Sequence, residues 1–284
     1  MGYGYHRPST LDEAFVLVAE IPDSRFVAGG TDLLVQLRKG EPEPPALISL
    51  RGLRELGGVE SSRRVRIGAG VPLSDIEVNP AVADMFPALA KSITKLGSRQ
   101  IRNVATMGGN LCNASPAADT APPLLIYGAS VELRDARGTR ELTVEDFLQG
   151  PGKTALRPGE ILTAILLDPP AEAARSVFLR KGRVAMDLPI SSVAALAEWD
   201  GATWQRVRLA AGAVAPVPLR LKRSEAIVEG TNLEAGIRAR ARETARSEIS
   251  PITDLRSTED YRRHLTGVLV ERALEHLAGE PGRP

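Results

Sequence analysis

Apolar positions in the first part of the chain follow helical and strand periods in turn. Thr10 and Glu13 stand at the spacing of a capping box, and the apolar residues after them recur at helical intervals, which predicts a helix. Residues 25–30, RFVAGG, indicate a short buried strand that runs into a glycine pair. Residues 31–40 then predict one or two helical turns.

The middle of the chain continues with mixed periods. Residues 63–76 alternate like a strand and end as a helix start, and residues 80–97 suit an amphipathic helix that Pro87 splits or kinks. Residues 130–148 predict a hairpin with its turn at DARG, followed by a short helix. Residues 159–168 predict another strand.

The pattern changes at about residue 175, where three strand-like segments precede three helix-like segments. This order predicts a separate α+β unit, with a three-stranded antiparallel sheet and a helix bundle. The strands are expected within 175–182, 188–201 and 204–216, and the helices within 220–230, 232–249 and 258–279.

Composition narrows the class of protein. Lys and Arg number 36 against 35 Asp and Glu, so the net charge of +1 gives no basic field for nucleic acid. No apolar run reaches the ~18 residues of a membrane span, and the N-terminus lacks the pattern of a signal peptide, so a cytoplasmic location is expected. One cysteine, Cys112, and three scattered histidines leave no iron–sulfur or zinc ligand set, so we expect no metal site in this chain.

Two glycine pairs with polar neighbours are the candidate chemistry. Gly29-Gly30 follows a predicted strand, and Gly108-Gly109 stands between Thr106 and Asn110. Glycines let backbone approach a phosphate closely, and successive free N–H groups form an anion-binding concavity. Asp119, a little downstream, has the chemistry to accept hydrogen bonds from ribose hydroxyls.

Other interpretations of these glycines remain open at this level. A glycine pair between apolar stretches also marks a plain turn. Residues 67–72, IGAGVP, lack the third glycine of a Rossmann fingerprint, and the chain has no Gly-Lys-Ser/Thr of a Walker loop. Cys112 is expected to be a small packing residue beneath the second loop.

The segments AGGTDLL (28–34) and GSRQIRNVATMGGNLCNASPAADTAPPLL (97–125) resemble the FAD-binding medium subunit of molybdenum hydroxylases, the xanthine dehydrogenase and carbon monoxide dehydrogenase class. The resemblance covers nearly the whole chain, since residues 182–195 and 250–274 are similar to the C-terminal domain of that subunit. NLCNASPAAD is closer to the xanthine, aldehyde and N-heterocycle branch.

The resemblance implies a fold and a domain division. The expected fold is α+β, with a two-subdomain FAD-binding domain of the PCMH/vanillyl-alcohol-oxidase-like type over residues 1–172. Its subdomains would span about 1–57 and 58–172, and the C-terminal flavoprotein domain would span 173–284.

The resemblance also implies the cofactor contacts. The two glycine loops would hold the FAD pyrophosphate from two sides, largely by backbone N–H groups. Asp119 would bind the sugar portion of the adenosine, Leu162 would pack near the adenine or flavin ring, and Arg180 or Lys181 would supply a cation near the flavin. The implied contacts are Val27, Ala28, Gly29, Gly30, Thr31, Asp32, Leu33, Leu34, Thr106, Met107, Gly108, Gly109, Asn110, Asp119, Leu162, Arg180 and Lys181.

The implied function is electron transfer by non-covalently bound FAD, with no catalytic acid or base in this chain. A large subunit would carry the molybdopterin cofactor, and a small subunit two [2Fe–2S] clusters; electrons would leave through FAD to NAD+ or another acceptor. Two other interpretations remain. One is a self-sufficient FAD-dependent oxidoreductase acting directly on a small molecule, and the other is a scaffold subunit that has lost its flavin.

Overall fold

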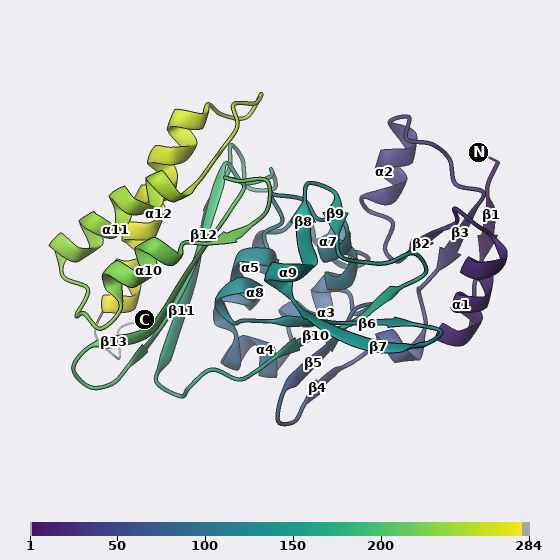
Figure 1. The fold of residues 1–284 in the computed structure, drawn as a ribbon, viewed down its shortest axis with the longest axis horizontal. Helices are drawn as coiled ribbons and strands as arrows, with labels where there is room; N and C mark the ends of the chain where they lie inside the picture. The colour runs from purple at the N-terminus through teal and green to yellow at the C-terminus, as the bar shows by residue number, and fades with distance from the viewer. Residues whose placement is uncertain (1, 280–284) are drawn as a thin grey trace.

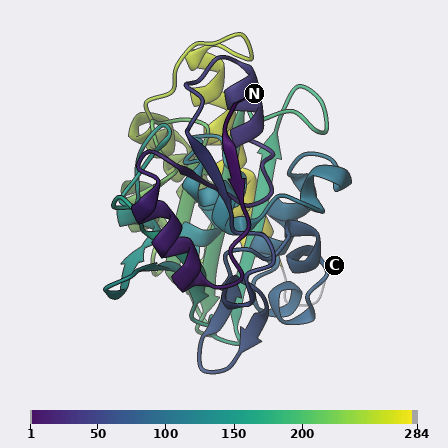
Figure 2. The same cartoon turned by 90° about the vertical axis from the view of Figure 1, so that its right-hand side faces the viewer.

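Three larger sheets follow one another along the molecule, and a fourth has only two strands, β8 and β9 (Figure 1). The structure is a computed structural model, and it describes residues 2–279. The N-terminal sheet lies at one end and the C-terminal helices at the other, with a five-stranded sheet and its helices between them (Figure 1). Figure 2 looks from the N-terminal end, with the small sheet and its helix α1 in front.

The N-terminal unit is a parallel three-stranded sheet in the order β1-β3-β2. Its elements are β1 (Gly4–His6), α1 (Leu11–Glu20), β2 (Arg25–Val27), α2 (Leu33–Arg38) and β3 (Ala46–Ser49). The side chain of Thr10 caps α1 by accepting from the Glu13 N–H, which confirms the predicted helix start. The Glu13 carboxylate completes the cap by accepting from the Ser9 N–H at 2.7 Å.

The middle sheet has five antiparallel strands in the order β4-β5-β10-β6-β7. Its strands are β4 (Val59–Ser61), β5 (Val65–Gly68), β6 (Ser130–Asp135), β7 (Gly138–Thr143) and β10 (Ile161–Leu167). β10 is central and almost wholly buried, and the hairpin of β6 and β7 turns at the predicted place.

Short helices between β5 and β6 cover this sheet. They are α3 (Leu73–Glu77), α4 (Pro80–Met85), α5 (Pro87–Lys95), α6 (Arg99–Arg102), α7 (Met107–Cys112) and α8 (Ala121–Ile126). Pro87 divides α4 from α5, because proline cannot donate the next helical hydrogen bond. The remaining small elements are η1 (Arg54–Leu56), α9 (Val144–Phe147), β8 (Leu148–Gly150) and β9 (Lys153–Thr154).

The C-terminal sheet has four strands, not the three predicted from sequence. They are β11 (Ala174–Lys181), β12 (Ser191–Trp199), β13 (Trp204–Gly212) and β14 (Leu219–Arg220). The helices are α10 (Lys222–Val228), α11 (Ala235–Glu248) and α12 (Glu259–Ala278). Sequence pattern missed β14 because two residues carry no alternation; only pairing with β13 defines the strand.

Helices cover both faces of the C-terminal sheet, because successive side chains of β12 pack into two different cores. Ala194 and Leu196 pack into the core shared with the middle sheet and α8. Val193, Ala195 and Ala197 pack into a second core with α11 and α12. The C-terminal sheet is therefore buried on both sides and is joined firmly to the middle unit.

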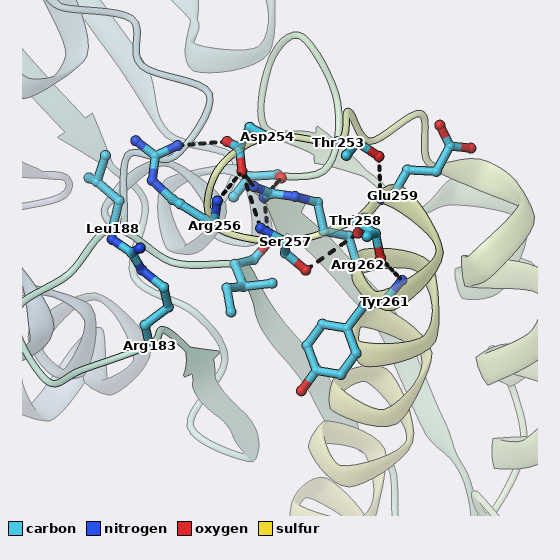
Figure 3. Close-up of polar contacts among 12 residues, drawn as sticks. Arg183, Leu188, Thr253, Asp254, Arg256, Ser257, Thr258, Glu259, Tyr261 and Arg262 are labelled. Carbon is cyan, nitrogen blue, oxygen red and sulfur yellow. Dashed lines mark hydrogen bonds and ion pairs between the residues drawn. The ribbon is translucent and has the colours of Figure 1, made fainter.

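A buried ion pair connects the start of α12 to the ends of two strands (Figure 3). Arg262 is 3% exposed and donates to Asp254 Oδ1 at 2.8 Å, to the Ile190 carbonyl at 2.7 Å and to the Ala213 carbonyl at 2.9 Å. Arg256 donates to the other carboxylate oxygen of Asp254 at 2.8 Å. This network fixes the chain just before β12.

Candidate functional site

A cavity of about 600 Å³ lies where the three units meet. The loop after β2, the start of α7, the segment before α8 and the loop between β11 and β12 all contribute to its wall. Its volume is in the range of pockets that bind cofactors and other small molecules. The lining includes Val27, Ala28, Gly29, Gly30, Thr31, Asp32, Leu33, Thr106, Gly109, Asn110 and Asp119 of the residues implied by the sequence.

The two glycines of the first loop have different roles. A Cβ on Gly29 would overlap the backbone carbonyl of Val104 and lie 3.0 Å from the Ala105 Cα. Gly30 has a φ of +71°, and the Leu34 side chain lies directly over it. Gly29 thus allows the two loops to touch, and Gly30 allows the turn into α2.

The second loop begins a helix. Thr106 caps α7, and its Oγ1 accepts from the Gly109 N–H at 3.0 Å. The Gly108 N–H donates to the Ala69 carbonyl at 3.1 Å, and a Cβ on Gly108 would lie 2.6 Å from the Ala69 Cβ. Gly108 is therefore required by packing against the end of β5, whereas Gly109 faces the cavity.

The backbone donors of the second loop already have acceptors in the protein. Besides Gly108 and Gly109, the Asn110 N–H donates to the Thr106 carbonyl at 3.0 Å. These three N–H groups are therefore less available to a bound anion than the sequence implied.

A hydrogen bond between side chains joins the two halves of the cavity. Gln36 of α2 donates to Asn113 Oδ1 at 3.0 Å, just after α7. Within the second half, Thr120 donates to Asn110 Oδ1 at 2.6 Å. The loops around residues 29 and 108, far apart in the chain, thus form one site.

Asp119 is the cavity residue with the most unusual environment. It is 4% exposed, and its Oδ2 pairs with Arg180 Nη1 at 2.9 Å. Its Oδ1 is buried and has no hydrogen-bond partner in the protein. Burial raises the pKa of Asp119 to about 7, although Arg180 acts in the opposite direction.

Charge in the lining is mostly negative. Among the lining residues in the described part of the chain, Arg25 is the one cation, and it pairs with Glu41 at 3.0 Å. Desolvation raises the pKa of Asp32. An anionic group bound here would consequently depend on peptide dipoles more than on side-chain cations.

Six residues implied by the sequence lie outside the lining, Arg180 and five others. Met107 is fully buried in the core, and Leu162 is buried in the central strand β10, opposite Leu133. Gly108 packs on Ala69. Leu34 is partly exposed above Gly30, and Lys181 is exposed at the end of β11.

Arg180 also lies outside the lining, and its donors are used within the protein. Its Nη1 donates to Asp119 and to the Lys95 carbonyl at 2.6 Å, and its Nη2 donates to the Asp187 carbonyl. Lys181 has no such role, which makes it the freer of the two candidate cations.

Several lining residues were not predicted. Gln36 and Asn113 join the loops, and Leu96, Ile101 and Leu188 add apolar side chains to the lining. Leu188 comes from the loop between β11 and β12, which carries no glycine pair. Only the family resemblance of residues 182–195 pointed to this segment.

Cys112 lies in the cavity wall. Burial raises the pKa of its thiol to about 12, so the sulfur remains protonated at neutral pH. Among residues 2–279, no group of three or more His, Cys, Asp or Glu side chains is placed to hold a metal ion. Within the same residues, no helix is long and apolar enough to cross a membrane.

Comparison with known protein families gives two matches that together cover most of the chain. The family described as FAD binding domain in molybdopterin dehydrogenase matches residues 1–169. The family described as CO dehydrogenase flavoprotein C-terminal domain matches residues 177–277.

Individual proteins match over nearly their full length. The xanthine dehydrogenase FAD-binding subunit of Escherichia coli O157:H7 is 32% identical over 282 residues, covering 98% of this chain and 97% of that protein. A chain of reconstituted CO dehydrogenase from Oligotropha carboxidovorans superimposes with a TM-score of 0.94 at 28% identity, covering 98% of both chains. A chain of quinoline 2-oxidoreductase from Pseudomonas putida 86 gives a TM-score of 0.93 at 27% identity, covering 98% of this chain and 97% of that one.

Proposed function

We propose that FAD lies in the cavity between the two glycine loops, because this chain belongs to the FAD-binding medium subunits of the molybdenum hydroxylase family. The chain is an oxidoreductase subunit with an FAD-binding domain. The single observation that carries the placement is the meeting of both loops and Asp119 around one cavity of about 600 Å³.

The residues present fit FAD. The buried Oδ1 of Asp119 lacks a hydrogen-bond partner, and a buried carboxylate oxygen calls for a donor. FAD carries such donors in its sugar and ribityl hydroxyls and in its flavin ring. Ala28 to Leu33 would hold the pyrophosphate, with Thr106, Gly109 and Asn110 on the other side.

FAD supplies the redox chemistry when bound, since it accepts and releases electrons singly or in pairs. The chain binds and orients the cofactor. Leu96, Ile101 and Leu188 would give the cofactor apolar contacts, and Asp119 would hold a hydrogen bond at Oδ1. Of the two candidate cations, Arg180 lies nearer the proposed flavin site because it pairs with the lining residue Asp119, whereas Lys181 is exposed and lies outside the lining.

The proposed path of electrons runs through partner subunits. A small subunit with two [2Fe–2S] clusters would deliver electrons that originate at the molybdopterin cofactor of a large subunit, and NAD+ or another acceptor would receive them. The single cysteine of this chain supports the placement of clusters elsewhere. Relatives named as medium chains and FAD-binding subunits support a multi-subunit assembly.

We also propose the domain division expected from the sequence, with residues 1–172 binding FAD and residues 173–284 forming the C-terminal flavoprotein domain; residues 1 and 280–284 of this division lie outside the described part of the chain. The two parts share one core, since side chains of β11, β12 and β13 pack with those of the middle sheet.

The test is FAD uptake by the purified full chain. The chain is freed of flavin, titrated with FAD, and followed by the quenching of flavin fluorescence. Saturable uptake of one FAD per chain is expected, and no uptake would refute the proposal. Co-purification with molybdopterin and iron–sulfur subunits distinguishes an electron-transfer subunit from a self-sufficient oxidoreductase, which would turn over substrate alone.

A further inference from the structure

The guanidinium of Arg180 lies directly behind the wall of the cavity. Its side chain is 7% exposed. It binds Asp119, the Lys95 carbonyl and the Asp187 carbonyl, which come from three separate segments. Asp119 and Asp187 both line the cavity, and Lys95 directly precedes the lining residue Leu96.

The pairing leaves Asp119 with one free oxygen. Arg180 Nη1 binds Oδ2 at 2.9 Å, and Oδ1 has no partner in the protein. A buried carboxylate that is held on one side only is stabilised further when a donor reaches the other oxygen. The carboxylate is thereby fixed in an orientation in which Oδ1 is available to a bound molecule.

We propose that Arg180 is a positioning residue for the cofactor site and acts on FAD through Asp119. Arg180 orients the carboxylate of Asp119 with Oδ1 free for a donor of FAD. Through the Asp187 carbonyl it also holds the 182–189 segment as a wall of the same cavity. This inference rests on the proposed function, because it takes FAD as the molecule that Asp119 binds.

Arg262 provides a matched comparison within the same chain. Like Arg180 it is buried, and it also binds one carboxylate and two backbone carbonyls. One of those carbonyls belongs to Ile190, so both arginines bind the second half of the loop between β11 and β12, Arg180 at Asp187 and Arg262 at Ile190. Asp254, the carboxylate partner of Arg262, does not line the cavity.

The experiment is a double-mutant cycle on FAD affinity in the flavin-free full chain. The variants are Asp119→Asn, Arg180→Met and the double variant, with Arg262→Met alone and combined with Asp119→Asn as the control. Each is titrated with FAD, and circular dichroism establishes that each is folded. A residue that acts through another loses its effect when that other residue is replaced.

Asp119→Asn and Arg180→Met are each expected to weaken FAD binding by about 10-fold, the loss of one charge-assisted hydrogen bond. In the Asp119→Asn background, Arg180→Met should weaken binding by less than about 3-fold more. Arg262→Met should have the same effect on FAD affinity in both backgrounds.

Other outcomes would overturn the inference in distinguishable ways. Equal losses from Arg180→Met in both backgrounds would mean that Arg180 does not act through Asp119. If Asp119→Asn left FAD affinity unchanged, Asp119 would not bind FAD and the inference would fail, while FAD binding by the chain would stand. If the wild-type chain bound no FAD, the proposed function and the inference would fail together.

Arg180→Lys keeps the test decisive if the methionine variant does not fold. Lysine retains a charge beside Asp119 but lacks the planar fork that binds three acceptors. A partial rescue is therefore expected, with a loss of FAD affinity smaller than for Arg180→Met or Arg180→Gln and again below about 3-fold when residue 119 is asparagine. A lysine variant that loses as much affinity as Arg180→Gln would contradict the role of the charge at this position.

Discussion

Gly29 lies against the backbone of Val104, so closely that a Cβ on Gly29 would overlap the Val104 carbonyl. This contact joins the first glycine loop to the chain that leads into the second. The glycine is thus needed to bring the two loops together, whether or not it also faces a ligand.

Gly29→Ala is expected to destabilise the chain by about 1–3 kcal/mol, because one added methyl group must push two backbone segments apart. Urea unfolding of the flavin-free chain measures this. Gly236→Ala is the control, since a Cβ there meets no atom within 4 Å and the position lies in α11, where alanine is favoured. Equal stabilities of the two variants would contradict close contact between the loops.

Gly109→Val is expected to weaken FAD binding by at least about 10-fold. Gly109 faces the cavity, and its one close neighbour for a Cβ is Thr106 Oγ1 at 3.0 Å. The added side chain would occupy space proposed for the pyrophosphate and change the free energy of unfolding by only about 1 kcal/mol. Affinity is read from fluorescence titration and stability from urea unfolding. An unchanged affinity would place the pyrophosphate elsewhere.

Ionisation of Asp119 is expected to make the free energy of unfolding depend on pH. The pKa of Asp119 is raised to about 7, above the ~4 of an unfolded aspartate. Between these pH values the folded chain holds a proton that the unfolded chain has lost. The contribution of Asp119 to stability therefore decreases as pH rises from about 4 to about 7. Asp119→Asn should remove this component, which unfolding at pH 5, 6, 7 and 8 measures.

FAD binding should show the opposite dependence on pH. A donor at Oδ1 favours the ionised carboxylate, so FAD affinity should increase as pH rises through about 7, and binding should release protons. Titrations between pH 6 and 8 test this. The slope should vanish in Asp119→Asn, and a slope that persists there would assign the titration to another group.

The bond between Gln36 and Asn113 should contribute about 0.5–1.5 kcal/mol to the stability of the flavin-free chain. Gln36→Ala and Asn113→Ala are each expected to lose about this amount, and the double variant little more than either alone. Strict additivity in urea unfolding would show that the two side chains do not interact.

Cys112 should react slowly with thiol reagents in the native chain. Burial raises the pKa of its thiol to about 12, and only the thiolate attacks. Labelling with a disulfide reagent at pH 8 should be at least about 100-fold slower in the folded chain than in urea. Because Cys112 lines the cavity, FAD should slow labelling further. Rapid labelling in both states would show an accessible thiolate instead.

Elements whose signals are local in sequence were predictable. Thr10 and Glu13 start α1, Pro87 divides α4 from α5, and the DARG segment turns the hairpin of β6 and β7. Each depends on residues within a few positions of one another, and the physical cause is a cap, a missing N–H or a turn preference. The strand β14 has no such signal and was missed.

The sequence also brought the two glycine loops and Asp119 forward as site candidates, and the structure places all of these segments at one cavity. It did not indicate what each glycine does. Gly29 and Gly108 are required by contacts with Val104 and Ala69, which lie in other elements. The sequence alone does not distinguish a glycine that faces a ligand from one that packs against another backbone segment.

The sequence by itself determined most of the local elements and carried a motif set specific enough to indicate the family. The tertiary structure decided which atoms meet. Only folding places Arg180 against Asp119, 61 positions away. Arg180, a candidate cofactor contact in the sequence, is thus a partner of the Asp119 carboxylate. The physical reason is that pairing and burial of charges depend on distances between elements, which no local pattern encodes.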